Sequence, residues 1–381
     1  MDFNLTKEQK DIQKAAREFA QGEFDPDLAL DLEKKGHYPS EILKRACELG
    51  FIGMHIPERY GGQGLGLLEN VLVVEEFCCQ HSGVGIALSL SDFGSEMILR
   101  FGNDAQREKY LRSIIKGEST SSLAYLEKDQ GNNFTSFKST AKRNGNGYLI
   151  NGNKSFVFNG TLSGPMIILC QLQHKTRSVE NVALIVEKGA DGIVSSSIGG
   201  RVGMRMVPMS EITFTNLKVS HEGLIGNEGQ GLTLLMKSLN EMNIEAAAMG
   251  TGIAQGSFNL ALAYAKQREQ FGRKIGSFEA IRDKLADMAT KIEIARMLTY
   301  KAAWSFDRNI LNNTVNYMAK MISSETALEV ARDSLHIFGG YGYIVESKIE
   351  QFYRDASMVD IIGTPGGIDK GLIADQVIGK I

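Results

Sequence analysis

Residues 144–160 read NGNGYLINGNKSFVFNG, and this stretch decides the fold that we expect. It holds Asn-Gly pairs at 144–145, 146–147, 151–152 and 159–160, between short runs rich in Tyr, Ile, Phe and Val. Asn-Gly is the strongest short-range signal of a β-hairpin, because both residues accept the positive φ that the favoured two-residue turns require. The stretch therefore predicts antiparallel β structure.

Sequence patterns typical of β-strands extend on both sides of this stretch, from about residue 119 to residue 228. Apolar runs at Met166–Leu172 and Val182–Val186 read as buried strands, and Glu211–Thr215 alternates between polar and apolar side chains. Alternation with a period of two is typical of a strand with one buried face. We therefore predict a central all-β domain.

The chain reads as helical on both sides of this domain. Thr6 and Gln9 form a capping box, and a second helix is expected from Ser40 to Gly50. Beyond residue 231, apolar residues recur three and four positions apart, as in a bundle helix: Ile281, Leu285, Met288, Ile292 and Ala295. The prediction is an α+β protein with an N-terminal helical domain (1–118), a middle β-barrel (119–228) and a C-terminal helical bundle (229–381).

Composition excludes several classes of function. The 381 residues carry 42 Lys+Arg against 45 Asp+Glu, a net charge of −3, so no basic field is available for nucleic acid. We find no signal peptide and no apolar run of the roughly 20 residues that a membrane span needs, so a soluble, cytoplasmic protein is expected. Four cysteines and six scattered histidines predict neither a disulfide framework nor a metal site. Walker A, G-x-S-x-G and H-E-x-x-H motifs do not occur in the sequence.

Several short motifs, spread along the chain, together resemble those of a known protein family. They are Pro57-Glu58-Arg59-Tyr60-Gly61-Gly62, Asn151-Gly152-Asn153-Lys154, Gly203-Met204-Arg205, Arg268-Glu269-Gln270-Phe271-Gly272, Gly339-Gly340-Tyr341-Gly342 and Tyr353-Arg354-Asp355-Ala356. In this order, and over essentially the whole chain, they resemble the flavin-dependent acyl-CoA dehydrogenase family. The resemblance implies a C-terminal four-helix bundle and FAD bound between barrel and bundle, completed by a neighbouring subunit of a homotetramer. It also implies an acyl-CoA substrate and an electron-transferring flavoprotein as electron acceptor.

Residues at the positions that match the family's motifs are expected to contact FAD. The resemblance implies flavin contacts at Tyr125, Leu126, Gly131, Asn132, Phe156, Phe158 and Thr364. It implies contacts to the adenosine and pyrophosphate, largely across the subunit interface, at Arg268, Phe271, Glu279, His336 and Gly340.

The catalytic base departs from the family pattern. Most relatives carry I-Y-E-G-T after Y-R-D-A, with the Glu as base, whereas this chain reads Ile361-Ile362-Gly363-Thr364 and has no carboxylate in either alignment. The other position where relatives keep a base aligns with Met242. Its neighbours Glu241 and Glu245 are expected to point to other sides of the helix.

Asp92 is the replacement that we favour. It lies in the otherwise apolar stretch 86–94, which lines the acyl pocket in relatives, and a carboxylate is costly to bury there without a function. We expect Ser89, Asp92 and Gly363 to line the substrate pocket, with Gly363, Gly366 and Gly367 leaving room for a ring.

A base in this place favours a particular reaction. It suits a 1,4-elimination on cyclohex-1-ene-1-carboxyl-CoA, with the proton taken from C3 and the hydride lost from C6, giving the 1,5-diene. The sequence thus resembles the alicyclic acyl-CoA dehydrogenases of anaerobic aromatic metabolism. Three alternatives stay open. They are ordinary α,β-dehydrogenation of a short, branched or saturated cyclic acyl-CoA with Glu241 or Glu245 as base, a catalytically silent flavin-binding homologue, and an oxygen-using oxidase.

Overall fold

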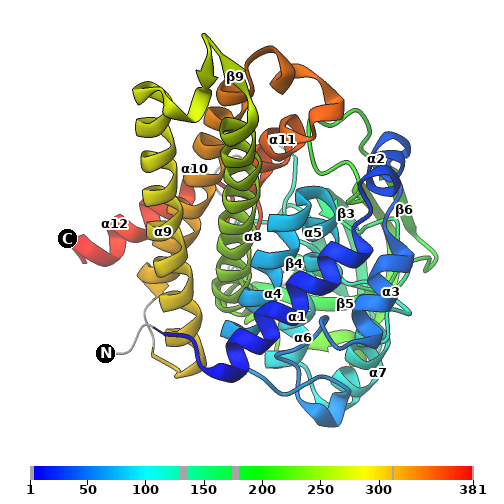
Figure 1. The fold of residues 1–381 in the computed structure, drawn as a ribbon. Coiled ribbons are helices and arrows are strands. Elements are labelled where there is room, and N and C mark those ends of the chain that lie inside the picture. Colours follow the sequence, from blue (N-terminus) through cyan, green and yellow to red (C-terminus); the bar gives the residue numbers. More distant parts are fainter. Residues whose placement is uncertain (1–3, 129, 131–135, 174–179, 311–312, 380–381) are drawn as a thin grey trace.

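A computed structural model describes residues 4–128, 130, 136–173, 180–310 and 313–379. Its N-terminal part is helical, its middle part is a β-sheet and its C-terminal part is helical again, as predicted (Figure 1). The N-terminal helices are α1 (Lys7–Glu23), α2 (Pro26–Lys35), α3 (Ser40–Glu48), α4 (Leu67–Gln80), α5 (Ser82–Ser89), α6 (Ser95–Phe101) and α7 (Asp104–Ile115).

Local chemistry sets the ends of these helices. The Thr6 hydroxyl accepts the Gln9 N–H and the Gln9 side chain accepts the Thr6 N–H, so the predicted capping box opens α1. The apolar run from residue 67 to residue 101 is broken twice. His81 is extended between α4 and α5, and a turn that ends at Gly94, with φ of 95°, separates α5 from α6. This second break carries Asp92.

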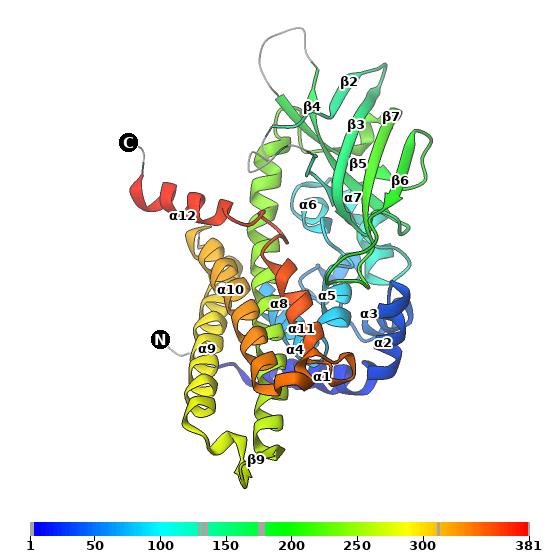
Figure 2. The same ribbon diagram turned by 90° about the horizontal axis from the view of Figure 1, so that it is seen from above.

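The middle part is an eight-stranded sheet at one end of the molecule (Figure 2). Its strands are β1 (Ser122–Ala124), β2 (Thr140–Arg143), β3 (Gly147–Phe158), β4 (Pro165–Leu172), β5 (Glu180–Glu187), β6 (Ile193–Ser197), β7 (Met209–Ser220) and β8 (Leu224–Ile225). The hydrogen-bonded order is β6-β7-β3-β2-β4-β5-β8, and β1 pairs in parallel with β4. In β7 the side chains of Ile212 and Phe214 are buried, as the alternation predicted, and the buried register then shifts by one residue to Leu217.

The Asn-Gly pairs serve different purposes. Asn144 donates its N–H to the carbonyl of Gly147 and closes the predicted hairpin between β2 and β3. Asn151-Gly152, by contrast, makes no turn, because it lies inside β3 at an irregularity in the pairing with β7. Gly152 has φ of 143°, and a Cβ there would meet Ser139 at 2.5 Å. The pair therefore marks a β-bulge and a close approach of two strands.

The C-terminal part is built on long helices. Its elements are α8 (Gly231–Gln267), β9 (Glu269–Gln270), β10 (Arg273–Lys274), α9 (Glu279–Asp307), α10 (Asn313–Phe338), α11 (Ile349–Val359) and α12 (Ile368–Ile378). Helices α8, α9 and α10 lie side by side in both views, α11 packs against α8 and α10, and α4 packs against α8 (Figures 1 and 2). In α9, Met288, Ile292 and Ala295 are buried on the predicted face. Among the described residues, no helix combines the length and apolarity needed to cross a membrane.

Candidate active site

A largely apolar cavity of about 370 Å³ lies where the sheet meets α11 and the turn after α5. Its walls include Phe93, Leu123, Tyr125, Leu126, Phe156, Phe158, Arg201, Gly203, Met209, Ser357, Met358 and Ile361. The structure thus brings together four residues expected to contact the flavin, Tyr125, Leu126, Phe156 and Phe158. A volume of several hundred Å³ with few polar groups is typical of a cofactor or ligand pocket.

Two features of this cavity fit a flavin ring. Phe156 has φ of 55° and is 55% exposed, so the chain holds a flat apolar side chain out of its own core. The buried Nη1 of Arg201 has no hydrogen-bond partner among the described residues, and a buried donor without a partner is costly. A planar group with carbonyl oxygens would cover the first and accept from the second.

A second cavity, of about 520 Å³, brings Arg268 and Gly340 together. Tyr264 and Phe338 also line it and stack with their ring centroids 4.2 Å apart. Within the described part of the chain, a Cβ on Gly340 would meet nothing within 4 Å, so the backbone is open to a ligand. The three other residues expected at the adenosine end, Phe271, Glu279 and His336, are exposed on the single chain.

The remaining expected flavin residues lie elsewhere. Gly131 and Asn132 fall outside the described residues. Thr364 is fully buried, and its N–H and hydroxyl both bond to the side-chain oxygen of Asn243, at 2.9 and 3.1 Å. Its hydroxyl is therefore already used within the chain.

The structure corrects the expectation that Gly363 leaves open space. Its φ is 76°, and a Cβ there would lie 2.3 Å from Oδ1 of Asn243. A Cβ on Gly366 would likewise meet the Asp360 carboxylate, and only Gly367 has open space around it within the described residues. The volume expected for a ring beside this loop is thus filled by polar side chains.

A buried ion pair fixes this loop in place. Lys320 Nζ and Asp369 Oδ2 are 2.9 Å apart, and both side chains are almost fully buried. Lys320 also donates to the carbonyls of Asp360 and Thr364, while the Tyr125 hydroxyl donates to the carbonyl of Gly363. The loop that carries the base in relatives is here anchored through its backbone.

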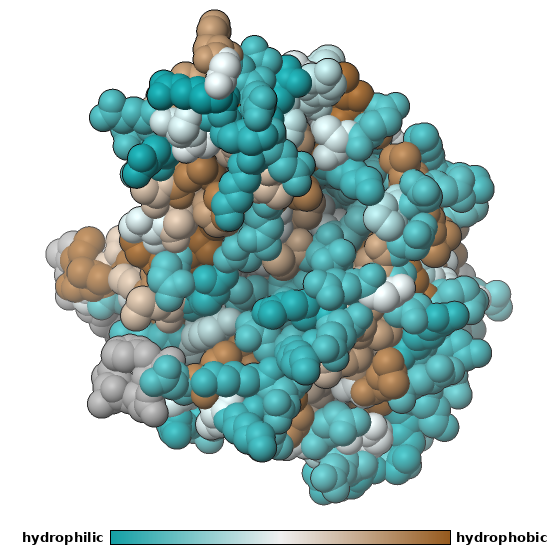
Figure 3. Space-filling model, viewed as in Figure 1, coloured by the Kyte–Doolittle hydropathy of each residue, from teal (hydrophilic) through white to brown (hydrophobic). Residues whose placement is uncertain are grey.

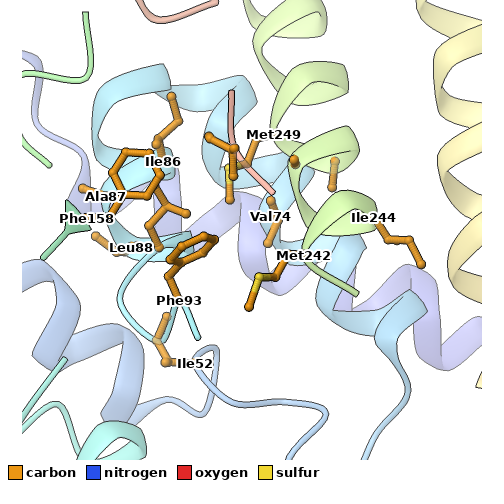
Figure 4. Packing of buried hydrophobic residues seen from close by; sticks show 14 of the residues in the cluster. Ile52, Val74, Ile86, Ala87, Leu88, Phe93, Phe158, Met242, Ile244 and Met249 are labelled. Carbon is orange, nitrogen blue, oxygen red and sulfur yellow. The ribbon is translucent and has the colours of Figure 1, made fainter. Parts of the chain in front are cut away.

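Asp92 lies in the turn between α5 and α6, and this turn is bound to the edge of the sheet. The Asn159 amide donates to the carbonyl of Leu90 at 2.6 Å, and the Ser121 N–H donates to the carbonyl of Ser91 at 2.8 Å. The neighbouring Phe93 packs edge-on against Phe158, with the ring centroids 5.4 Å apart. Figure 4 shows Phe93 with Phe158 on one side and Val74 and Met242 on the other. These contacts fix the turn in which Phe93 lines the large cavity and Asp92 is the preceding residue.

Asp92 is 8% exposed and lines a small cavity of about 10 Å³. Ser89, which was also expected in the substrate pocket, lines the same cavity. The other walls are mostly apolar: Phe51, Ile52, Val73, Val74, Phe77 and Leu88. Burial raises the pKa of Asp92, whereas the charge of His55 and the residue's own backbone N–H oppose the rise. No other side chain in the described part of the chain donates a hydrogen bond to this carboxylate.

The other two acids considered as bases are engaged. Both oxygens of Glu241 accept from Arg100, at 2.6 and 3.0 Å. Glu245 accepts from the Asn70 amide at 2.9 Å, and burial raises the pKa of Glu245 well above its usual range. Met242 is buried and puts a thioether at the alternative base position.

Two residues near the candidate active site, Arg201 and His55, were not predicted from the sequence. Arg201 gave one signal, a lone cation in the glycine-rich run before Gly203. His55 gave none, because it approaches Glu241 only through the tertiary fold. Asp355 was quoted as part of a motif, and the structure gives it a local role. Its carboxylate accepts from the Met204 N–H at 2.7 Å and the Ser82 hydroxyl at 2.6 Å, joining α11 to the rim of the large cavity.

The three-part fold and the aromatic cavity define the class of a flavin-dependent oxidoreductase. Models of the acyl-CoA dehydrogenase N-terminal, middle and C-terminal domains match residues 6–118, 122–217 and 229–378, so the chain belongs to the acyl-CoA dehydrogenase family, whose members use FAD. It is similar to a 3-(aryl)acrylate reductase of Clostridium sporogenes, with 34% identity over 98% of this chain and 99% of that protein. It is 32% identical to a subunit of the caffeyl-CoA reductase-Etf complex of Acetobacterium woodii, over 99% of this chain and 100% of that one. The solved butyryl-CoA dehydrogenase of Megasphaera elsdenii superposes with a TM-score of 0.94 at 31% identity, covering 99% of this chain and 100% of that one.

Proposed function

We propose that this acyl-CoA dehydrogenase removes a proton from a ring carbon of an alicyclic acyl-CoA, with Asp92 as the base and cyclohex-1-ene-1-carboxyl-CoA as the best-fitting substrate. One observation carries the proposal. Asp92 is a buried carboxylate next in sequence to Phe93, which lines the large cavity, and no side chain in the described structure donates a hydrogen bond to it. Glu241 is held by Arg100 and Glu245 is held by Asn70, and the loop position of the usual base aligns with Gly363 or Ile362, neither of which is a carboxylate.

The chemistry of the ring suits a base in this place. The C3–H of a cyclohexene thioester is conjugated through the double bond, so it is acidic in the way that an α-hydrogen of a saturated thioester is. Transfer of this proton to Asp92, with loss of a hydride from C6, gives cyclohexa-1,5-diene-1-carboxyl-CoA. Bound FAD supplies the hydride acceptor. The raised pKa of Asp92 supports the role, because a base works best when its pKa lies near the operating pH.

The proposal places one demand on the pocket. A cavity of about 10 Å³ holds one water molecule and no ring. Phe93 lines the large cavity while its neighbour Asp92 lines the small one. The small cavity therefore has to widen when an acyl group reaches Asp92.

The assembly around the site is part of the proposal. The two cavities expected to hold the flavin and its adenosine end are separate on one chain, which supports a homotetramer in which a neighbour completes each site. The similarity to a subunit of a reductase-Etf complex supports an electron-transferring flavoprotein as the acceptor.

The test is anaerobic flavin reduction by cyclohex-1-ene-1-carboxyl-CoA, followed as bleaching of the flavin absorbance. Asp92→Asn keeps the size of the side chain but cannot accept the proton, so we expect reduction to slow about 10²–10⁴-fold. FAD content should be unchanged, because Asp92 is not among the walls of the large cavity. Glu241→Gln and Glu245→Gln serve as matched controls.

Other outcomes select the alternatives. An Asp92→Asn variant that keeps the parental rate, beside a Glu241→Gln or Glu245→Gln variant that loses it, would establish ordinary α,β-dehydrogenation. Bleaching by butyryl-CoA and not by the ring thioester would do the same. A protein that binds FAD but is reduced by no acyl-CoA is a silent homologue. Rapid reoxidation of the flavin by air identifies an oxidase.

A further inference from the structure

The large cavity offers a ligand very few side-chain donors. Three of its wall residues have polar side chains, Tyr125, Arg201 and Ser357. The Tyr125 hydroxyl already donates to the carbonyl of Gly363. The Ser357 hydroxyl donates to the carbonyl of Arg354 at 2.6 Å. Among the described residues, the side-chain donors left for a ligand of this cavity therefore belong to Arg201.

Arg201 keeps one of these donors unused. Its Nη2 donates to the carbonyl of Arg205 at 3.0 Å, whereas its Nη1 is buried and has no hydrogen-bond partner in the described part of the chain. Burial lowers the pKa of this guanidinium, and no neighbouring carboxylate opposes the effect. An arginine nevertheless stays protonated at pH 7, because its ordinary pKa lies above 12. The wall of the cavity thus carries a positive charge with a donor to spare.

Other partly buried arginines of this chain are paired with carboxylates. Arg100, Arg296 and Arg354 each approach a buried glutamate oxygen, at 2.6, 2.8 and 2.5 Å. Arg201 forms no ion pair with any residue that the structure describes. A charge removed from water is costly unless a partner offsets it. We therefore expect an electron-rich group to meet Arg201 in the protein as it works.

The loop that carries Arg201 is fixed by α11. Arg354 donates to the carbonyl of Val202 at 3.1 Å, and the Met204 N–H donates to the Asp355 carboxylate at 2.7 Å. Both neighbours of Arg201 along the chain are thus tied to one helix before any ligand binds. A donor held in place in this way stabilises a charge without the cost of reorganising around it.

A flavin ring suits this position better than a phosphate group. The walls around Arg201 include Phe156, Phe158 and Met209, and removing a phosphate from water into such surroundings is costly. The flavin ring is flat and largely apolar, and its carbonyl oxygens accept hydrogen bonds. A hydride brings the ring two electrons and one proton, so the neutral ring becomes an anion unless it takes a second proton. Negative charge therefore appears on the ring when it is reduced.

We propose that Arg201 is a cofactor-binding residue that stabilises the negative charge of the reduced flavin ring and so raises the reduction potential of bound FAD. The inference rests on the ring occupying the large cavity, and it does not depend on the substrate or the base proposed above. Charge placed near the flavin ring is one of the means by which a protein tunes this cofactor.

The first measurement is the midpoint potential of the FAD-loaded protein, found by equilibration with a dye of known potential. In Arg201→Gln the reduced form should be destabilised at least tenfold relative to the oxidised form, which lowers the potential by about 30 mV. Arg201→Lys keeps the charge and should stay close to the parent. Arg205→Gln makes the same change of charge four residues on and is the matched control, because Arg205 faces Glu33 at 3.8 Å and does not line the cavity.

The second measurement separates a charge effect from a structural one. The protein is reduced with dithionite, and the pH at which the ring takes its second proton is read from the flavin absorbance. In the parent this pH should lie at least one unit below that of free reduced FAD, and in Arg201→Gln it should rise by at least one unit, since one unit is tenfold in the protonated fraction.

Other ionisable groups near the loop do not account for such a shift. Tyr125, the other ionisable side chain on the described walls, is neutral at pH 7 because burial raises its pKa. Arg205 and Arg354 face glutamates of their own. Burial raises the pKa of Asp355 to about 6, but this residue is present in the parent and in every variant, so it cancels from the difference.

The outcomes separate this inference from the proposed function. A parent whose reduced flavin is protonated at the same pH as free reduced FAD overturns the inference, even when no variant folds. So does an Arg201→Gln protein with the parental potential. If that protein instead binds the acyl-CoA more weakly, Arg201 contacts the substrate. If it forms a smaller assembly, Arg201 pairs with a neighbouring subunit. If the potential shifts as expected but the ring thioester leaves the flavin oxidised, the role of Arg201 stands and the proposed substrate falls.

Discussion

At the scale of single residues, burial decides which carboxylates can act and which only hold the fold. Asp92 and Asp355 are both buried, but Asp355 has two donors and Asp92 has no side-chain donor in the described structure. Donors that bond to a carboxylate fix its direction and consume its lone pairs. The same residue type is therefore a candidate base in one turn and a structural link in α11.

The pKa of Asp355 gives a prediction about stability. Burial raises this pKa from 3.8 to about 6, although Ser82 and Met204 donate to the carboxylate. A raised folded pKa means that the protonated form is favoured by folding. The stabilisation is complete below pH 3.8 and is lost as pH rises through about 6.

Asp355→Asn is neutral at every pH and keeps both contacts, because the Ser82 hydroxyl can accept as well as donate. We expect its Tm, measured relative to the parent, to rise as pH goes from 4 to 7, by the equivalent of up to roughly 3 kcal/mol. Asp375→Asn on the exposed side of α12 makes the same change of charge and is the control. A Tm difference that does not vary with pH would contradict the assignment.

At the scale of elements, the loop between α11 and α12 depends on a buried ion pair. Lys320 in α10 binds Asp369 and two loop carbonyls, and Thr364 binds Asn243 of α8. Helices α8 and α10, distant in sequence from this loop, thus hold it in place, and the loop has neither of its aligned positions, Ile362 and Gly363, occupied by a carboxylate. The anchoring is through the backbone, so it does not depend on a functional side chain at that position.

Breaking this anchor has a predictable cost. Lys320→Met leaves the Asp369 carboxylate buried without its cation, and removal of one partner of a buried pair typically costs about 3–5 kcal/mol. We expect a clear fall in Tm and partial loss of FAD, because the Tyr125 hydroxyl bonds to the same loop. Lys291→Met removes one partner of an exposed pair with Glu329 and should change Tm little. Equal effects of the two variants would show that Lys320 does not anchor the loop.

Elements were predictable from the sequence where a local pattern sets them. The Thr6 capping box and the Asn144 turn depend on residues a few positions apart, and both occur as predicted. The Asn151-Gly152 pair was misread as a turn signal because the bulge depends on β7, some 60 residues further on. The approach of His55 to Glu241 was not predicted for the same reason, because these two residues meet only in the folded chain.

At the scale of the whole molecule, one chain presents surfaces that it does not cover itself. The face in Figure 3 is mostly hydrophilic with scattered hydrophobic patches. On α9, by contrast, Ile294, Met297 and Trp304 are 44–50% exposed at positions three and seven apart, which places them along one side of the helix. An apolar stripe of this kind is typical of an interface between subunits.

The distribution of the expected FAD contacts points the same way. Arg268 follows the end of α8 beside the β9–β10 hairpin, which Figure 2 shows at the opposite end of the molecule from the sheet. The aromatic cavity is lined by residues of the sheet and of the end of α11. The two groups of expected contacts thus line separate cavities, and we expect the two ends of each FAD to bind two chains.

The last prediction therefore couples assembly to the cofactor. We expect the purified protein to be yellow, with one FAD per chain, and to elute as a tetramer. Met297→Glu puts a charge into the apolar stripe of α9, which should give a smaller species that has lost most of its FAD, although Met297 lines neither cavity. Thr215→Glu, an equal change of charge on the exposed face of β7, should leave size and FAD content unchanged. Light scattering after gel filtration gives the mass, and the ratio of flavin to protein absorbance gives the occupancy. A Met297→Glu species that is smaller but still carries one FAD per chain would mean that a single chain completes its own site.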